Sequence, residues 1–482
     1  MDRRIAAIAS ISISLFAGTT TAIAQSLVVG PNVNISKSAG YQGETAIAIN
    51  PTNPLSMFTW SNNITGPAVN FAAFTTNGGN TWTGRTTGSD GFPALGGDPS
   101  CTYDSFGNLY ATSFNSAFTQ IVIGRSVDGG QTFTTLTGFA IVDQPTVKAG
   151  PGSNGAPQSV WITYVSSTGL AARGAASNGV ANTGAFGALQ LIPGGGSGNF
   201  GDVAIGPGGR VAVGYQTPSG GVGPSNIQVA VDADGLGAGA FGAAGAAVTT
   251  QVGGFRPIPA QPNRTVDAEM GLAYDNTGGP RNGRLYMVYT DAPNTTSNDL
   301  NIFVRSSTND GLTWSAAVKV NDDVGATSQF FSKIAIDPIT GNIAVVWLDA
   351  RNDPTNNRLV ELWGTVSLDG GLTFLPNVKI AAGQTNGTQG VIGNANEMGD
   401  YIGVDFYNNV FYPVWADNSN STNDNPNGAL SSLDIYGARV TLVSIPEPVT
   451  LLLLGSVAGG YLLRRRVFPR MPRRTISYLR GR

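Results

Sequence analysis

Short apolar runs, separated by turns rich in glycine and asparagine, recur along most of this chain. A first type of run is seen in "ETAIAINP" (44–51), "MGLAYD" (270–275) and "SKIAIDP" (332–338). A second type follows after a turn, as in "RLYMVYTDA", "NIAVVWLDA" and "VFYPVWADN". Apolar runs of about four to eight residues between turn signals are typical of β-strands, and no long helical periodicity competes with them. The pattern therefore predicts an all-β protein.

The runs belong to a longer repeat. Its units begin near seven positions: Glu44, Asp98, Gln144, Phe200, Glu269, Phe331 and Gly399. The last unit stops after three strands, and "VVGPNVNISKSAG" (28–40) resembles the fourth strand of unit six, "TFLPNVKIAAG" (373–383). Pairing of the first strand with the last unit would close a ring and remove its exposed edges. We predict a seven-bladed β-propeller of four-stranded antiparallel blades, with six blades as the alternative if a glycine-rich unit between 144 and 260 is not a blade.

Four of the units carry the same short turn after their third strand. Its Ser or Thr hydroxyl and its Asp or Asn side chain can bind backbone N–H groups of the turn, and its glycine tolerates a positive φ. The aromatic residue that follows is expected to pack against the neighbouring blade. We therefore predict a structural role for four sets of residues: Thr75, Asn77, Gly79 and Trp82; Ser126, Asp128, Gly130 and Phe133; Ser307, Asn309, Gly311 and Trp314; Ser367, Asp369, Gly371 and Phe374.

This turn resembles the Asp-box, or BNR, turn of sialidases and related propellers. The resemblance extends over about residues 26–443 and implies a fold, not an activity. A sialidase grips a carboxylate with three arginines and uses a Tyr nucleophile, a Glu partner and an Asp acid/base. On this sequence the resemblance implies substrate binding by Arg256, Arg264 and Arg351, and catalysis by Tyr401, Glu269 or Glu397, and Asp349.

The sequence also departs from the family. "GFRPIPA" (254–260) is similar to the Phe-Arg-Ile-Pro motif of sialidases, but it contains the extra Pro257 and stands before unit five. The family carries this motif before its first Asp-box. In the body of the chain no arginine precedes Arg85, so the usual first substrate arginine has no equivalent. These departures place sialidase activity in doubt.

The two ends of the chain have the composition of targeting segments. Residues 1–24 contain two arginines, an apolar run and a small-residue end, which predicts a secretory signal cleaved after Ala24. Near the other end, Pro446, Glu447 and Pro448 precede an apolar stretch and the cluster Arg464, Arg465 and Arg466. This tail resembles the PEP-CTERM sorting signal of bacterial surface proteins, which implies processing by an exosortase; a plain membrane anchor is the alternative. We therefore expect a signal (1–24), a propeller (25–443) and a sorting tail (444–482).

Composition excludes several chemistries. The chain has no histidine, so Ser-His-Asp catalysis and His-ligated metal sites are ruled out, and its one cysteine, Cys101, cannot form an internal disulfide. Without its ends the chain carries a formal charge of about −11, which argues against nucleic acid as a partner. No cofactor is predicted. Ca²⁺ is the open alternative, either at the acidic strand starts or in the loop "DNSNSTNDNPNG" (417–428), which we otherwise interpret as a solvated insertion.

Two functions remain open from sequence alone. The first is an exported, cell-surface or matrix propeller without catalytic activity, which binds a glycan or protein ligand and meets the membrane only through its tail; its processing partners would be signal peptidase and an exosortase. The second is a glycoside hydrolase of the sialidase type acting on extracellular polysaccharide. The hydrolase requires either paired carboxylates across a cleft or an arginine cluster beside a Tyr-Glu pair.

Overall fold

The computed structural model describes residues 24–63, 69–388 and 397–445. The predicted signal before Ala24 and the predicted sorting tail after Ile445 therefore lie outside the described residues. Residues Leu27–Leu442 form one compact unit. Within the described ranges no helix is both long and apolar enough to cross a membrane.

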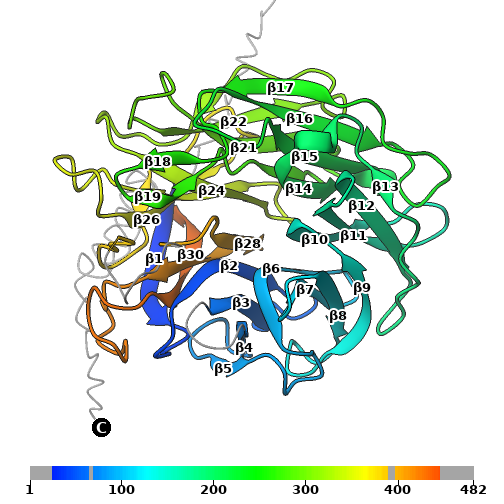
Figure 1. Cartoon of the computed structure of the whole chain (residues 1–482), viewed down its shortest axis with the longest axis horizontal. Coiled ribbons are helices and arrows are strands. Elements are labelled where there is room, and N and C mark those ends of the chain that lie inside the picture. The colour runs from blue at the N-terminus through cyan, green and yellow to red at the C-terminus, as the bar shows by residue number, and fades with distance from the viewer. Residues whose placement is uncertain (1–23, 64–68, 389–396, 446–482) are drawn as a thin grey trace, which may run out of the picture. The chain divides into compact units, whose positions relative to one another are not determined.

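The compact unit is a seven-bladed β-propeller, as predicted. In the described residues, seven antiparallel sheets have four strands each (Figure 1). Blade 1 consists of β2 (Gln42–Ile49), β3 (Met57–Asn63), β4 (Phe71–Thr75) and β5 (Thr83–Thr86). Blade 2 consists of β6 (Leu95–Tyr103), β7 (Leu109–Asn115), β8 (Gln120–Ser126) and β9 (Thr134–Ala140). Blade 3 consists of β10 (Asp143–Pro151), β11 (Gln158–Ser166), β12 (Gly169–Ser177) and β13 (Gln190–Leu191).

Blades 4 to 6 follow the same order, with the first strand innermost. Blade 4 consists of β14 (Asn199–Ile205), β15 (Val211–Thr217), β16 (Ser225–Asp232) and β17 (Gly245–Thr250). Blade 5 consists of β20 (Gly271–Tyr274), β21 (Leu285–Asp291), β22 (Asn301–Ser307) and β23 (Val318–Lys319). Blade 6 consists of β24 (Gln329–Ile336), β25 (Ile343–Asp349), β26 (Glu361–Ser367) and β27 (Val378–Lys379). Two 3-10 turns flank β14, at Gly195–Ser197 and Pro207–Gly209. A separate hairpin of β18 (Arg256–Ile258) and β19 (Gln261–Val266) connects blades 4 and 5.

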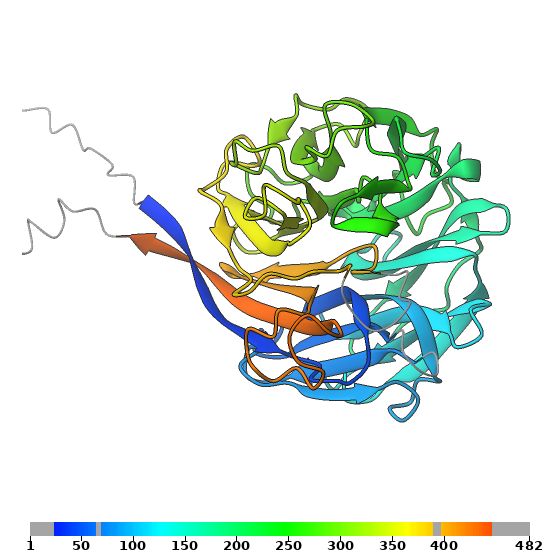
Figure 2. The same cartoon turned by 60° about the vertical axis from the view of Figure 1, so that its left-hand side comes forward.

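Blade 7 combines both ends of the described chain. Its strands are β28 (Gly403–Tyr407), β29 (Val410–Asp417), β30 (Asp434–Ile445) and, on the outside, β1 (Ala24–Asn34). Figure 2 shows β1 in blue beside β30 in orange. Their junction includes a bond from the Asn34 amide to the Asp434 carboxylate, at 2.6 Å. The N-terminal strand thus closes the ring, as the sequence predicted.

The seven predicted unit starts share one backbone feature. Each has a positive φ: 53° at Glu44, 48° at Asp98, 44° at Gln144, 55° at Phe200, 40° at Glu269, 53° at Phe331 and 82° at Gly399. In blades 1 to 4 and 6 this residue lies in a β-bulge, where the register of the two innermost strands shifts. Because a bulge redirects side chains, the polar residues among these, Glu44, Asp98 and Gln144, are directed to one end of the propeller axis.

The four repeated turns connect third and fourth strands at the opposite end. In the turn of blade 2, Asp128 accepts bonds from the Ser126 hydroxyl (2.7 Å) and the Thr132 amide (2.9 Å), and the Gly130 amide donates to Ser126 (2.9 Å). A side chain at Gly130 would collide with the ring of Phe58. The same bonding scheme recurs in the turns of blades 1, 5 and 6. The hydrogen bonds are local to each turn, whereas the close approach of its glycine places the turn against the preceding blade.

The aromatic residue of each turn packs on that preceding blade. Phe133 meets Phe58 of blade 1 with ring centroids 5.5 Å apart, and Trp82 meets Tyr412 of blade 7 at 5.8 Å. Trp314 and Phe374 join the hydrophobic clusters of blades 4 and 5 in the same way. Each turn therefore packs its own blade against the preceding one, at the end of the propeller away from the bulges.

Candidate functional site

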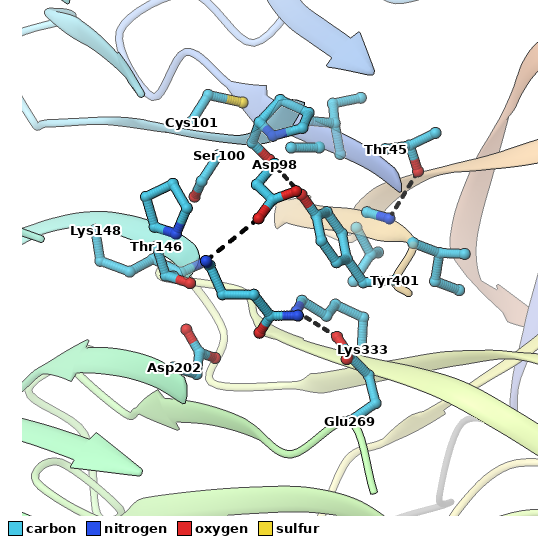
Figure 3. Close-up of a pocket in the computed structure, with 18 of the residues that line it drawn as sticks. Thr45, Asp98, Ser100, Cys101, Thr146, Lys148, Asp202, Glu269, Lys333 and Tyr401 are labelled. Atoms are coloured by element: carbon cyan, nitrogen blue, oxygen red, sulfur yellow. Dashed lines mark hydrogen bonds and ion pairs between the residues drawn. The ribbon is translucent and has the colours of Figure 1, made fainter. Parts of the chain in front are cut away.

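A cavity lies where the first strands of the blades converge. Its volume is about 70 Å³, and residues from all seven described blades line it (Figure 3). Four of the residues with positive φ are among them, namely Asp98, Gln144, Phe200 and Glu269. The cavity therefore opens at the bulged end of the axis, which we call the channel mouth.

Lys333 and Glu269 form an ion pair on one wall of the cavity. The ammonium of Lys333, on β24, lies 2.9 Å from the carboxylate of Glu269, two residues before β20. Burial raises the pKa of Glu269 to about 7, although Lys333 acts in the opposite direction. Despite the burial, Glu269 and Asp202 keep the pKa of Lys333 above its ordinary value. This wall thus presents a fixed acceptor and a fixed donor side by side.

Asp98 belongs to a different wall, on β6, and accepts the backbone N–H of Gln144 at 3.2 Å. Burial, followed by repulsion from Asp143 and Asp400, raises the pKa of Asp98 to about 7. Burial and the neighbouring Asp400 and Asp98 also raise the pKa of Glu44 well above its ordinary range. The mouth therefore contains carboxyl groups that titrate near neutral pH.

The β18–β19 hairpin reaches from blades 4 and 5 to blade 7. On β19, Nε of Arg264 donates to the Asp400 carboxylate at 2.8 Å, and the guanidinium lies 3.4 Å from Glu44. The Glu397 carboxylate accepts the side-chain amide of Asn263 at 2.9 Å and the backbone N–H of Arg264 at 3.2 Å. Acidic groups beside the mouth therefore hold β19 of the hairpin in place.

Tyr401 lines the cavity between these walls. Its hydroxyl donates to the carbonyl oxygen of Pro99 at 3.3 Å, and its ring centroid lies 5.7 Å from the Lys333 ammonium. In the described residues no glutamate is hydrogen-bonded to it. Burial, supported by the charges of Glu44 and Asp98, raises the pKa of Tyr401 well above its ordinary value. A neutral phenol is a poor nucleophile, so this environment does not activate it.

Two of the expected anion-binding arginines are engaged elsewhere. Arg256 is 1% exposed and donates to the backbone carbonyls of Gln251 (2.8 Å), Asn294 (3.2 Å) and Ser297. It therefore holds the base of the β18–β19 hairpin.

Arg351 lies at the end of β25. It binds Asp349 at 2.9 Å and Asp322 at 2.8 Å, and it stacks on Trp363 at 4.0 Å. Asp349 is fully buried and also accepts the indole N–H of Trp347 at 2.7 Å. Neither Asp349 nor Arg351 lines the cavity.

The structure thus brings together only part of the expected constellation. Tyr401 and Glu269 line one cavity, and Arg264 and Glu397 lie beside its mouth. Among the described residues, Arg256, Arg264 and Arg351 share no hydrogen-bond or ion-pair partner. Sequence reasoning had singled out neither Lys333 nor Gln144 for the site. A lysine within the apolar run "SKIAIDP" was the available signal, because a charge in a strand that lines the axis has to find a partner.

Most of the loop 417–428 is partly or fully exposed, as expected of a solvated insertion, but buried side chains anchor it. Asp417 and Asn418 are fully buried, and Asp417 accepts the Trp415 indole N–H at 2.9 Å. The loop is anchored from within because these side chains satisfy buried backbone and ring donors. Across the described ranges no group of three or more acidic or cysteine side chains is arranged to hold a metal ion.

Fold and site together define a seven-bladed β-propeller with a polar cavity on its axis, and similar folds occur among solved structures. A protein of unknown function from Dyadobacter fermentans shares 10% identity at a TM-score of 0.46, over 86% of this chain and 99% of that one. The endosialidase of phage phi92 shares 11% identity at a TM-score of 0.46, over 86% of this chain and 70% of that one. The BP39L lectin of Burkholderia pseudomallei shares 11% identity at a TM-score of 0.44, over 70% of this chain and 84% of that one. No family model and no curated protein matches the chain.

Proposed function

We propose that this protein is an exported propeller that binds a glycan in the cavity at the channel mouth. The observation that carries the proposal is the lining of that cavity. Carboxylates (Asp98, Asp202 and Glu269), an ammonium (Lys333) and an aromatic ring (Tyr401) all border the same space. A hydroxyl-rich sugar ring suits such a lining, because its hydroxyls donate to the carboxylates and its apolar face can lie on the aromatic ring.

The proposed role does not include catalysis of the sialidase type. Arg256 is hydrogen-bonded to backbone carbonyls, Arg351 is hydrogen-bonded to Asp349, and Arg264 is hydrogen-bonded to Asp400. Tyr401 has a raised pKa and donates to a carbonyl oxygen. A substrate carboxylate would have to displace existing partners from every one of these arginines, which costs the desolvation of the acids left behind.

Export and surface location belong to the same proposal. The arginine pair and apolar run before Ala24 and the ordered features around Pro446, Glu447 and Pro448 support it. Signal peptidase and an exosortase would be the processing partners, and the tail would be the only membrane contact. Cell fractionation of the chain with Glu447→Ala tests this: retention in the membrane, where the unaltered chain reaches the surface, is the expected result.

Binding can be tested with the purified full chain on an immobilised panel of neutral, amino and acidic oligosaccharides. We expect a subset to be retained, and Tyr401→Ala to reduce retention because the cavity loses its aromatic face. Asp310→Asn is a matched control, since Asp310 pairs with Arg210 in a turn at the opposite end. Retention of no glycan by the folded protein would contradict the proposal and favour a protein ligand. Release of sugar from the panel would instead favour the glycoside hydrolase.

A further inference from the structure

Three blades carry a buried tyrosine at the same place in their second strand, near the end of the propeller that holds the repeated turns. Tyr110, Tyr286 and Tyr412 each lie five residues before the last residue of β7, β21 and β29, and each is at most 1% exposed. The hydroxyl of Tyr412 donates to the carbonyl oxygen of Gly79 at 3.2 Å, and that of Tyr110 donates to the Ser177 hydroxyl at 3.0 Å. Among the described residues, the proton of the Tyr286 hydroxyl has no acceptor.

Two arginines beside Tyr286 also have donors without acceptors. Arg281 and Arg284 lie in the turn between β20 and β21, and the Nε atom of each is buried and has no hydrogen-bond partner in the described ranges. Arg281 donates from its other end to the carbonyl oxygen of Gly341 at 3.2 Å, and its Nε lies 3.9 Å from the Asp275 carboxylate. Arg284 interacts with the phenol oxygen of Tyr286, which still leaves the phenol proton without an acceptor.

These groups meet at the repeated turn of blade 6. A Cβ built at Gly370 in that turn would lie 3.0 Å from the Tyr286 hydroxyl and 3.1 Å from Nε of Arg281, so the two atoms are at most about 6 Å apart. The same Cβ would collide with the Arg281 side chain, so the glycine permits the approach. The charges of Arg284 and Arg281 also act against the burial that raises the pKa of Tyr286. Both cations are therefore close to the phenol.

The cluster contains more donors than acceptors. In the described residues, Asp275 provides the one carboxylate within 4.0 Å of either guanidinium, and it already accepts the backbone N–H (2.9 Å) and the hydroxyl (2.5 Å) of Thr277. Buried donors without an acceptor are costly, and in native proteins they are usually satisfied by water or an ion. Two cations beside one carboxylate favour an anion. The Arg281 side chain is 24% exposed, so the cluster can be reached from solvent.

We infer that this cluster binds a tetrahedral oxyanion, a phosphate or sulfate group, between Arg281, Arg284 and the hydroxyl of Tyr286. Guanidinium groups match the oxygens of such anions with paired N–H donors, and the phenol supplies a further donor. Asp275 would repel the anion, but it is held away by Thr277 and leaves the cluster with a net positive charge. The site is separate from the channel mouth and does not depend on glycan binding there.

Titration calorimetry of the purified full chain with inorganic phosphate tests the inference, in chloride buffer at constant ionic strength. We expect one saturable site, and at saturation a rise of roughly 2 °C in the melting temperature, because the anion binds only the folded state. Additional chloride should produce no such rise. A parallel titration with glucose 6-phosphate distinguishes the source of the group, since the tighter of the two ligands shows whether the site prefers a free ion or an ester. Site-dependent binding of either supports the inference.

Variants of the cluster identify the site. Arg284→Gln should weaken phosphate binding about tenfold or more, because it removes a charged donor. Arg305→Gln is the matched control for charge. Arg305 belongs to the same blade but donates to the Tyr289 hydroxyl at 3.2 Å and to the Ser315 carbonyl oxygen at 3.1 Å, so its loss should leave phosphate affinity unchanged.

The tyrosine pair separates anion binding from packing. Tyr286→Phe should weaken phosphate binding several-fold without lowering the melting temperature of the anion-free protein, because its hydroxyl proton has no acceptor to lose. Tyr412→Phe should do the reverse, because its hydroxyl donates to Gly79.

Three results would overturn the inference. The first is that neither phosphate nor glucose 6-phosphate binds, and the second is that Arg284→Gln binds them as tightly as the unaltered chain. The third is a melting temperature of anion-free Tyr286→Phe that falls as far as that of Tyr412→Phe, which would show that an ordered water already satisfies the hydroxyl. Each of these results would leave the proposed glycan binding at the channel mouth untouched.

Discussion

Arg264 and Asp400 are bound to each other across 136 residues of sequence, at 2.8 Å between Nε and the carboxylate. Arg264 belongs to the hairpin that connects blades 4 and 5, whereas Asp400 precedes the first strand of blade 7. The same guanidinium lies 3.4 Å from Glu44, which accepts the side-chain amide of Asn62 in blade 1. One side chain thus links the hairpin to blades 7 and 1.

Replacement of Arg264 should therefore destabilise the propeller. Arg264→Ala leaves Asp400 and Glu44 as neighbouring carboxyls without a cation, and we expect a loss of about 1–3 kcal/mol in the free energy of unfolding. Urea unfolding monitored by tryptophan fluorescence measures it. Adding Asp400→Asn to Arg264→Ala should recover part of the loss, because a neutral amide does not repel Glu44. A double variant less stable than Arg264→Ala alone would contradict this account.

The acidic mouth should make the protein less stable as the pH rises. Asp98 and Glu269 have ordinary pKa values of 3.8 and 4.5, and in the folded protein both are raised to about 7. Between about pH 4 and pH 7 the folded state consequently binds more protons than the unfolded chain, so stability is greatest at the acidic end of this range and declines as pH increases. Thermal unfolding followed by circular dichroism at several pH values should show this slope.

Asp98→Asn should flatten that slope, since it removes one of the two groups. Asp128→Asn is a suitable control. Hydrogen bonds from Thr132 lower the pKa of Asp128 despite the partial burial of this carboxylate. The contribution of Asp128 to stability is therefore fully present above its ordinary pKa and is lost only at more acidic pH. A pH dependence that is unchanged in Asp98→Asn would show that other groups produce it.

The repeated turns should contribute to stability and not to binding. Asp369 accepts the backbone N–H groups of Leu372 (3.0 Å) and Thr373 (2.9 Å) and the hydroxyl of Thr373 (2.6 Å). Asp369→Ala should cost about 1–3 kcal/mol in the free energy of unfolding, because it leaves these donors without an acceptor. Asp369→Asn should cost less than half of that, as Asn77 and Asn309 occupy the same position in two other turns. Equal losses in both variants would point to a role beyond hydrogen bonding.

The N-terminal strand should be required for a soluble monomer. Without β1, the edge of β30 would expose unpaired backbone groups, and the Asp434 carboxylate would lose the Asn34 amide. A chain that lacks residues 25–36 should aggregate or associate during size-exclusion chromatography. Asn34→Ala keeps the strand and should remain monomeric with a lower melting temperature. A stable monomer of the shortened chain would show that the ring does not depend on β1.

Much of the fold is encoded locally, and the sequence determined it. The Ser126, Asp128 and Gly130 contacts span only two to four residues, so a short motif specifies the turn wherever it occurs. Strand order follows from the repeat, and the likeness of 28–40 to 373–383 predicted the strand that closes the ring. All seven predicted unit starts coincide with a residue of positive φ.

Only the tertiary structure decided which charged groups meet. Lys333 and Glu269 are 64 residues apart, and their pairing depends on two neighbouring blades presenting first strands side by side at the axis. Arg256 and Arg351 were equally plausible site residues from the sequence. In the structure, however, Arg256 binds backbone carbonyls and Arg351 binds Asp349, both away from the cavity. Local patterns determine turns and strands because their hydrogen bonds lie within a few residues. A binding site is assembled across blades, so its partners are fixed only when the ring closes.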